Sequence, residues 1–252
     1  MAAPDLHWRE WAAEMAGTAL LLLGGLGAVT LDFGHHSPIA PLLPSTSARL
    51  LLTGALFAGT GSLIAISPLG RMSGAHLNPA VTLAFWLSGK VHRHDLIAYW
   101  VAQCLGALLG AIILRTAWPD FATVGYGVTH PAASFPEPVA AAMEAGMSAL
   151  LILTILLCVS RMRTARWTPL AVWVVVTVLV WQGAPHTGTS LNPARSLGPA
   201  LVAGNLKALW VYLVGPPLGG VLATGLLVAV MDIRPVTAKL FHDPRYRSIF
   251  KG

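Results

Sequence analysis

The sequence predicts an all-α membrane protein in which six transmembrane helices and two shorter, re-entrant half-helices form two inverted repeats. Three observations lead to this fold class. Of the 252 residues, 55% are hydrophobic and only 10% are charged, whereas soluble domains carry about 25% charged residues. Six apolar segments are long enough to cross a bilayer, and one short motif recurs in both halves of the chain.

Six segments have the length of about 20 mostly apolar residues that a helix needs to cross the hydrocarbon core. They cover residues 12–31, 48–67, 95–115, 138–159, 167–183 and 206–231. Two further apolar segments, residues 79–88 and 193–203, are too short to span and are expected to be re-entrant. The start of the chain is polar and does not have the pattern of a cleavable signal peptide. We therefore expect residues 1–252 to form a single transmembrane domain.

The distribution of positive charge predicts the orientation. Twelve of the sixteen Lys and Arg residues fall on the side that holds the N-terminus, and four fall on the other side. Because cytoplasmic loops collect Lys and Arg, we expect both termini in the cytoplasm and the protein in the plasma (inner) membrane. The basic tail, residues 232–252, is expected to contact anionic lipid. Nucleic acid is not an expected partner, because no basic stripe lies on a soluble domain.

The two halves of the chain share one plan. Residues 14–23 resemble residues 144–153, and Leu-Asn-Pro-Ala occurs at residues 77–80 and again at residues 191–194. Each half, about 10–115 and about 138–231, therefore holds three spans and one half-helix. Because three is odd, the second half is upside down relative to the first, which gives inverted repeats.

The repeated motif consists of Asn78, Pro79 and Ala80 in the first half and of Asn192, Pro193 and Ala194 in the second. Asn is a favoured N-cap residue and Pro is favoured at the first helical position, so each motif begins a helix. Non-helical backbone at membrane depth is tolerated where it lines a watery cavity or is buried in protein. Two helix N-termini facing each other there repel cations. We expect the two asparagine amides to donate hydrogen bonds to a passing molecule and so to interrupt proton relay.

Residues 73–82, Ser-Gly-Ala-His-Leu-Asn-Pro-Ala-Val-Thr, and residues 188–196, Gly-Thr-Ser-Leu-Asn-Pro-Ala-Arg-Ser, carry a resemblance to a known family. The chain resembles the aquaporins, or major intrinsic proteins, over roughly residues 10–232. The resemblance implies a homotetramer with one pore in each subunit and passive conduction without protons or ions. No cofactor or metal is expected. An enzyme is not expected either, because no catalytic motif is present.

Arg195 is an ionisable residue within a membrane region and is therefore a functional candidate. The resemblance places it in a narrow selectivity filter, where its guanidinium donates to a permeating oxygen and repels cations. Glu14 and Glu144 lie in the first turns of two spans, where a bare carboxylate is costly. The resemblance supports a structural role for both, in which they accept backbone hydrogen bonds from the re-entrant loops and turn carbonyls such as that of His76 towards the lumen.

The other filter residues follow from counting back from each Asn-Pro-Ala without gaps, which gives Ala58, Val180 and Thr189. A local insertion near residues 67–68 would shift the frame on the second span and place Phe57 or Gly59 there instead.

Ala58 and Val180 are small for this family's water channels and predict a roomy filter. The expected solutes are water and small uncharged molecules such as glycerol or boric and arsenous acids. Ser196 stands where the family's glycerol facilitators usually carry Asp, so the pattern is more similar to nodulin-like intrinsic proteins and their bacterial relatives. A strict water channel is the alternative. A secondary transporter, which can share inverted repeats, and a purely junctional role are weaker alternatives.

Overall fold

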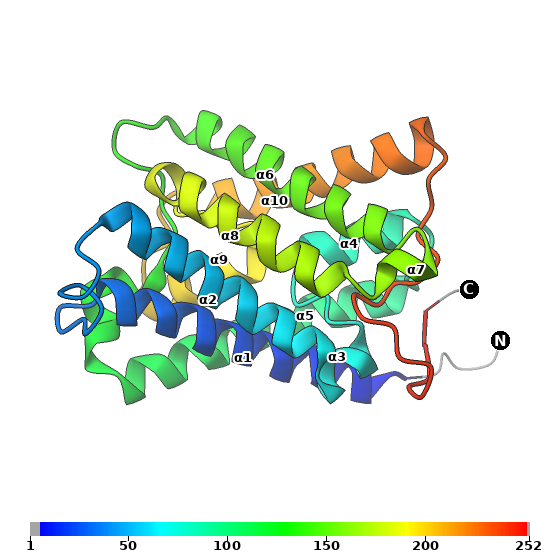
Figure 1. The fold of residues 1–252 in the computed structure, drawn as a ribbon, viewed down its shortest axis with the longest axis horizontal. Coiled ribbons are helices and arrows are strands. Elements are labelled where there is room, and N and C mark those ends of the chain that lie inside the picture. Colours follow the sequence, from blue (N-terminus) through cyan, green and yellow to red (C-terminus); the bar gives the residue numbers. More distant parts are fainter. Residues whose placement is uncertain (1–5, 251–252) are drawn as a thin grey trace.

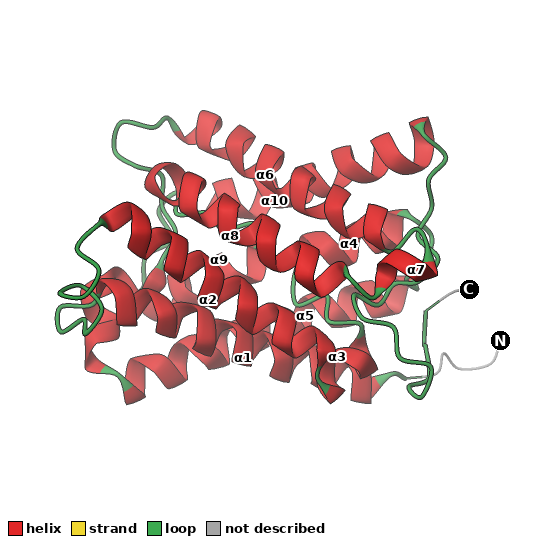
Figure 2. Cartoon of the chain, in the orientation of Figure 1, coloured by secondary structure: helices red, strands yellow, loops and turns green. Residues whose placement is uncertain are grey.

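The computed structural model describes residues 6–250. Helices account for all of the regular structure in this part of the chain (Figure 2). The helices are α1 Trp8–Phe33, α2 Thr46–Ile66, α3 Pro68–Ser73, α4 Pro79–Leu87, α5 Arg93–Ala117, α6 Glu137–Cys158, α7 Met162–Ala165, α8 Thr168–Thr187, α9 Pro193–Ala203 and α10 Leu209–Thr224. A 3₁₀ segment, Pro119–Gly127, follows α5, and a π-helical segment, Gly225–Val230, continues α10.

Six of these helices are long and apolar enough to cross a membrane: α1, α2, α5, α6, α8 and, with its continuation, α10. They match the six spans predicted from the sequence, and α4 and α9 match the two half-helices. The fold class is thereby confirmed. The main difference is that α8 continues past Pro185 to Thr187, because a proline so close to the helix end removes a single hydrogen bond.

Helix packing follows the inverted repeat. In the first half α1 packs against α5 and α2, and in the second half α6 packs against α10 and α8. The two halves meet where α2 packs against α8. They also exchange their half-helices, because α4 packs against α10 and α9 packs against α5. Each half-helix is therefore held by a spanning helix of the other repeat.

Glycines allow the closest helix contacts, at matching places in the two halves. A Cβ atom added to Gly106 of α5 would lie 2.2 Å from the carbonyl oxygen of Met15 in α1. A Cβ atom added to Gly219 of α10 would lie 2.2 Å from the carbonyl oxygen of Ala145 in α6. Larger residues at either place would force the two helices of the pair apart.

The bundle has two distinct ends (Figure 1). The start of α1, the short helices α3 and α7, and the tail after α10 lie together at one end, which we call the tail face. The loop after α1 and the segment after α5 lie at the other end, which we call the loop face. The half-helices α4 and α9 lie between these two ends.

Candidate functional site

The two Asn-Pro-Ala motifs begin α4 and α9 and meet inside the bundle. Pro79 and Pro193 occupy the first turn of these helices. The Asn78 side-chain oxygen accepts the backbone N–H of Ala80 at 2.8 Å, and the Asn192 oxygen accepts that of Ala194 at 3.0 Å. Each asparagine is therefore an N-cap that satisfies an otherwise free N–H group at its helix start.

The two asparagine amides also connect the repeats. Asn78 Nδ2 donates to the carbonyl oxygen of Leu191 at 2.8 Å, and Asn192 Nδ2 donates to that of Leu77 at 2.8 Å. Each amide thus holds the residue that precedes the other asparagine. Since an amide nitrogen carries two N–H groups, each asparagine retains one N–H beyond this contact.

The loops that lead into α4 and α9 have the same strained backbone. Ala75 and Leu77 have φ angles of 55° and 50°, and Thr189 and Leu191 have φ angles of 45° and 58°. Residues with side chains adopt this left-handed region only where the surroundings enforce it. The enforcing contacts come from two buried carboxylates.

Glu14 of α1 holds the first loop. Its carboxylate accepts the backbone N–H groups of His76 at 3.0 Å and Leu77 at 2.7 Å. It also accepts the Ser73 hydroxyl at 2.7 Å and the Gln103 amide at 2.8 Å. Glu14 is fully buried, so these four donors replace the water that the carboxylate has lost.

Glu144 of α6 holds the second loop in the same way. It accepts the backbone N–H groups of Ser190 and Leu191, both at 2.9 Å, and the Thr187 hydroxyl at 2.7 Å. The Tyr212 hydroxyl then donates to the carbonyl oxygen of Thr187 at 2.7 Å, and the first repeat has the equivalent bond from Tyr99 to Ser73. The sequence motifs did not identify either tyrosine as a loop support, although the two lie 21 and 20 residues after Asn78 and Asn192.

Two cavities lie on either side of the region between the half-helices. The tail-side cavity has a volume of about 100 Å³, and its polar lining comes from Ser62, His76, Asn78, Ser190 and Asn192. Its remaining wall is apolar and includes Ala58. The Ala58 side chain is therefore in this wall and is not brought to Arg195, in contrast to the position expected from counting.

The loop-side cavity has a volume of about 200 Å³, and its lining includes Val180, Thr189 and Arg195. Phe57 lines both cavities. Its ring faces the Arg195 guanidinium, with the central carbon of that group 5.6 Å from the ring centroid. On α2, Phe57 is therefore the residue that faces Arg195, where the ungapped count expected Ala58.

Arg195 lies in the first turn of α9 and is 6% exposed. Its Nη1 donates to the carbonyl oxygen of Gly127 at 2.7 Å. Gly127 has a φ of 67°, which suits glycine, and this turn carries its carbonyl to the guanidinium. A carbonyl contact and an aromatic face therefore fix the direction of the charged group.

The position of the Phe57 side chain depends on contacts that no sequence motif shows. A Cβ atom added to Gly25 of α1 would lie 2.4 Å from the Phe57 ring, so the ring fills the space that this glycine leaves. Helix α3 lies between α2 and Asn78 and breaks the regular spacing on which an ungapped count depends. The Ser67-Pro68 pair, where an insertion would shift the frame, is the signal in the sequence that pointed to Phe57.

Ser196, which follows Arg195, belongs to a hydroxyl network. Its Oγ lies 2.6 Å from Thr129 Oγ1 and 2.6 Å from Ser190 Oγ. Thr129 comes from the segment after α5, so this network connects the second half-helix to the loop face. Residue 129 belongs to no motif, so the sequence did not predict this contact.

Six spanning helices, two half-helices that meet start to start, and a cavity on each side of them define a polytopic membrane channel. The sequence profile of the Major intrinsic protein family matches residues 2–227. The chain belongs to this family, as its motifs predicted.

Similar proteins agree with this assignment. Aquaporin NIP1-1 of Zea mays is 35% identical over 217 residues, which cover 83% of this chain and 70% of that protein. Probable aquaporin TIP2-1 of Oryza sativa subsp. japonica is 31% identical over 219 residues, covering 85% and 84% of the two chains. The X-ray structure of the aquaglyceroporin from Plasmodium falciparum has the same fold, with a TM-score of 0.74 at 24% identity, over 90% of this chain and 97% of that one.

Proposed function

We propose that the protein is a passive channel for water and small uncharged solutes that excludes ions and protons. The observation that carries this proposal is the meeting of two capped helix N-termini, joined by Asn78 and Asn192, between the two cavities. A solute on this path passes the free N–H of each amide. A water molecule that accepts both N–H groups cannot also pass a proton along a continuous chain.

Ion exclusion follows from the charges along the same path. Each helix N-terminus carries about half a positive charge, and Arg195 adds a full one beside the loop-side cavity. The carboxylates of Glu14 and Glu144 are engaged by loop donors, so they are not free to attract a cation. Positive charge therefore lies at the two helix starts and beside the loop-side cavity, where it repels cations.

The filter that we infer consists of Phe57, Val180, Thr189 and Arg195. It has an apolar side, made of an aromatic ring and a valine, and a polar side, made of a hydroxyl and a guanidinium. Such a pairing suits molecules that carry hydroxyl groups on one side and carbon on the other. Glycerol and the neutral acids of boron and arsenic are the solutes that we propose beside water.

A strict water channel is the second candidate. The specific observation in its favour is the position of the Phe57 ring, 5.6 Å from the Arg195 guanidinium carbon. An aromatic ring at this place leaves less room than the alanine expected from the sequence.

Stopped-flow swelling of reconstituted vesicles against water, glycerol and boric acid tests the proposal. We expect Val180→His to reduce glycerol entry relative to water entry by about tenfold, because it narrows the filter and removes its apolar side. Phe57→Ala should shift this ratio towards glycerol. Ala58→Ser, in the wall of the tail-side cavity, is the matched control and should leave the ratio unchanged. Equal loss of both solutes in Val180→His would contradict the filter.

We further propose that the tail face is cytoplasmic and that the protein is a homotetramer in the plasma membrane, with lipid around it. The excess of Lys and Arg in the segments of the tail face supports this orientation. Native mass spectrometry of the detergent-solubilised protein tests the assembly, and protease protection of sealed vesicles tests the orientation.

A further inference from the structure

The tail after α10 does not extend away from the bundle. Val236 N donates to the carbonyl oxygen of Val159 at 2.8 Å, and the chain then crosses the tail face. Leu240 N donates to the carbonyl oxygen of Gly74, at the entry to the first re-entrant loop, at 3.0 Å. The tail is thus hydrogen-bonded to the same loop that carries Asn78.

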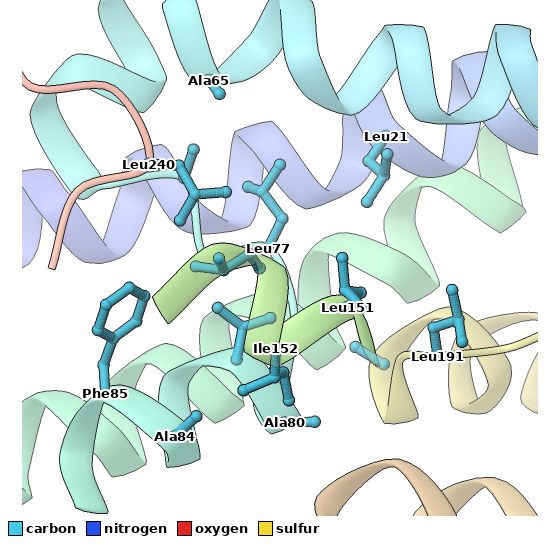
Figure 3. Close-up of a cluster of buried hydrophobic side chains, with 14 of the residues drawn as sticks. Leu21, Ala65, Leu77, Ala80, Ala84, Phe85, Leu151, Ile152, Leu191 and Leu240 are labelled. Carbon is cyan, nitrogen blue, oxygen red and sulfur yellow. The ribbon is translucent and has the colours of Figure 1, made fainter. Parts of the chain in front are cut away.

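Leu240 of the tail lines the tail-side cavity. It forms part of the lining together with Ala65 and Leu77, and Figure 3 shows these three side chains near one another. Leu240 is 6% exposed, and Ala238, two residues before it, is fully buried. An apolar side chain of the tail therefore forms part of the wall of this cavity.

His76 connects the tail to the pore lining. Its Nε2 lies 2.8 Å from the carbonyl oxygen of Ala238, and the Nε2–H donates to this oxygen. The Phe250 ring stacks on the imidazole with centroids 5.4 Å apart, and the Phe85 ring also stacks on it, at 4.8 Å. Because His76 lines the tail-side cavity, movement of the tail would change the surroundings of a pore residue.

A buried lysine fastens the tail. Lys239 Nζ donates to the carbonyl oxygens of Arg71 at 2.7 Å and Arg247 at 3.0 Å. Arg71 also pairs with Asp243 at 2.9 Å. Lys239 is fully buried, so it is not available to the anionic lipid that the sequence predicted for this tail.

We propose that residues 236–250 form a plug that seats in the tail-side mouth of the pore and closes it, and that conduction requires release of this plug. The inference rests on the proposed channel function. The segment that occupies the mouth is the chain's own tail. Lys239 and Arg71 hold the tail in place, and its Leu240 side chain lines the cavity.

Water flux per unit of reconstituted protein tests the plug. Lys239→Met removes the fastening ammonium while keeping a long side chain, and Leu240→Ala removes the covering side chain. We expect either variant to raise water flux by about threefold to tenfold if the closed state dominates. Deletion of residues 237–252 should raise it at least as much. Arg234→Ala, an exposed tail residue paired with exposed Asp232, is the matched control and should conduct as the unaltered protein does.

Trypsin cleavage after Arg245 and Arg247 gives a second readout that does not depend on flux. It should be faster in Lys239→Met than in the unaltered protein, because the tail is released more often. Equal flux with and without the tail would overturn the plug and leave the channel function standing. No flux of any solute in any form, including the deletion, would overturn both.

A second inference comes from a separate cluster at the tail face. His7 precedes α1, and His94 and Asp95 lie in the first turn of α5. One ligand atom from each of the three side chains lies within 4.8 Å of the other two. The Asp95 carboxylate accepts from Trp11 Nε1 at 2.9 Å, which fixes its orientation.

A buried carboxylate such as that of Asp95 needs positive or hydrogen-bonding partners. It is fully buried, and no Lys or Arg within residues 6–250 forms an ion pair with it. Its ionic neighbours are His7 Nδ1 at 2.9 Å and His94 Nε2 at 3.4 Å. Two imidazoles and one carboxylate are typical ligands of a transition metal. The indole orients the carboxylate, as hydrogen-bond partners of metal ligands commonly do.

We infer that His7, His94 and Asp95 bind a divalent transition metal, with zinc the best match to two nitrogens and one oxygen. Bonds of about 2.0–2.1 Å put tetrahedral ligand atoms about 3.3 Å apart, so the histidine rings have to move by at most about 1.5 Å. Such a metal would join the start of α1 to the start of α5.

Isothermal titration of the full-length protein with zinc chloride, and the visible absorption of its cobalt form, test this site. We expect one ion per subunit, with affinity reduced at least about tenfold in His94→Ala and in His7→Ala. His130→Ala, on the loop face, is the control and should bind normally. Absence of saturable binding, or binding equal in all variants, would overturn the assignment.

Discussion

The two re-entrant loops have the same backbone conformation but differ in some of their side chains. In both, an asparagine caps the half-helix and a buried glutamate fixes the preceding loop. Two residues before the asparagine, the first loop carries His76 and the second carries Ser190. Three residues after it, the first half-helix carries Val81 and the second carries Arg195.

The residues at these two positions make different contacts in the two halves. His76 contacts the tail and Ser190 contacts the hydroxyl network of Ser196. Val81 is part of the apolar core, whereas Arg195 faces Phe57 at the loop-side cavity. The comparison indicates that the residues shared by the two halves build the two loops, whereas the residues that differ give the two cavities different linings.

The largest expected effect comes from removing the carboxylates. Glu14→Ala leaves four donors without a partner and Glu144→Ala leaves three. Each unsatisfied buried group costs about 1–3 kcal/mol, so both variants should unfold at much lower denaturant, the first more than the second. Urea unfolding of the protein in mild detergent measures this. Glu10→Ala, also in α1 but half-buried, is the control, and an equally small loss in all three variants would break the comparison.

Replacing Arg195 by valine, the residue type at the equivalent place in the first half, should have the next largest effect. A guanidinium repels a cation about 4 Å away by about 4 kcal/mol at an effective dielectric of 20. We expect cation leak through Arg195→Val to rise by up to about 700-fold, since each 1.4 kcal/mol is a factor of ten, as measured by potassium flux from loaded vesicles. Lys207→Val, in an exposed loop of the second half, should remain tight. Unchanged cation exclusion in Arg195→Val would show that the helix N-termini suffice.

The smallest effect concerns acidity at the tail face. Hydrogen bonds from Arg245, together with the charge of Arg71, hold the pKa of Asp243 below its usual range. A lowered carboxyl pKa contributes to holding the tail at every pH above the ordinary value of about 3.9, and the contribution disappears only as pH falls through the lowered value. Trypsin release of the tail, divided at each pH by the cleavage rate of an unstructured peptide, should therefore be constant between pH 5 and pH 8. A rise in release within that range would implicate another group.

Much of the fold could be predicted because each signal is local. Span length, the Asn-Pro pairs and the early glutamates each depend on a few neighbouring residues. Lipid then enforces the helices, since no other partner is present for their backbone groups.

The remaining parts depend on contacts between distant segments. The ungapped count placed Ala58 in the filter, whereas the structure puts the Phe57 ring against Arg195, in the space left by Gly25. The basic tail was expected to contact anionic lipid, and of its basic residues Lys239 is buried and bonded to three backbone carbonyls. The Gly25–Phe57 and Lys239–Arg71 contacts join segments that are far apart in the sequence.

The crossed amide bonds have a consequence for the way the protein is made. The acceptor for Asn78 Nδ2 is the carbonyl oxygen of Leu191, 113 positions further along the chain. While the ribosome is still adding the second half, the first loop has no acceptor for this bond, so it cannot reach its final form before residue 191 has entered the membrane. Ordering of the conduit is thus a late step of biogenesis, reached after the spanning helices have been inserted.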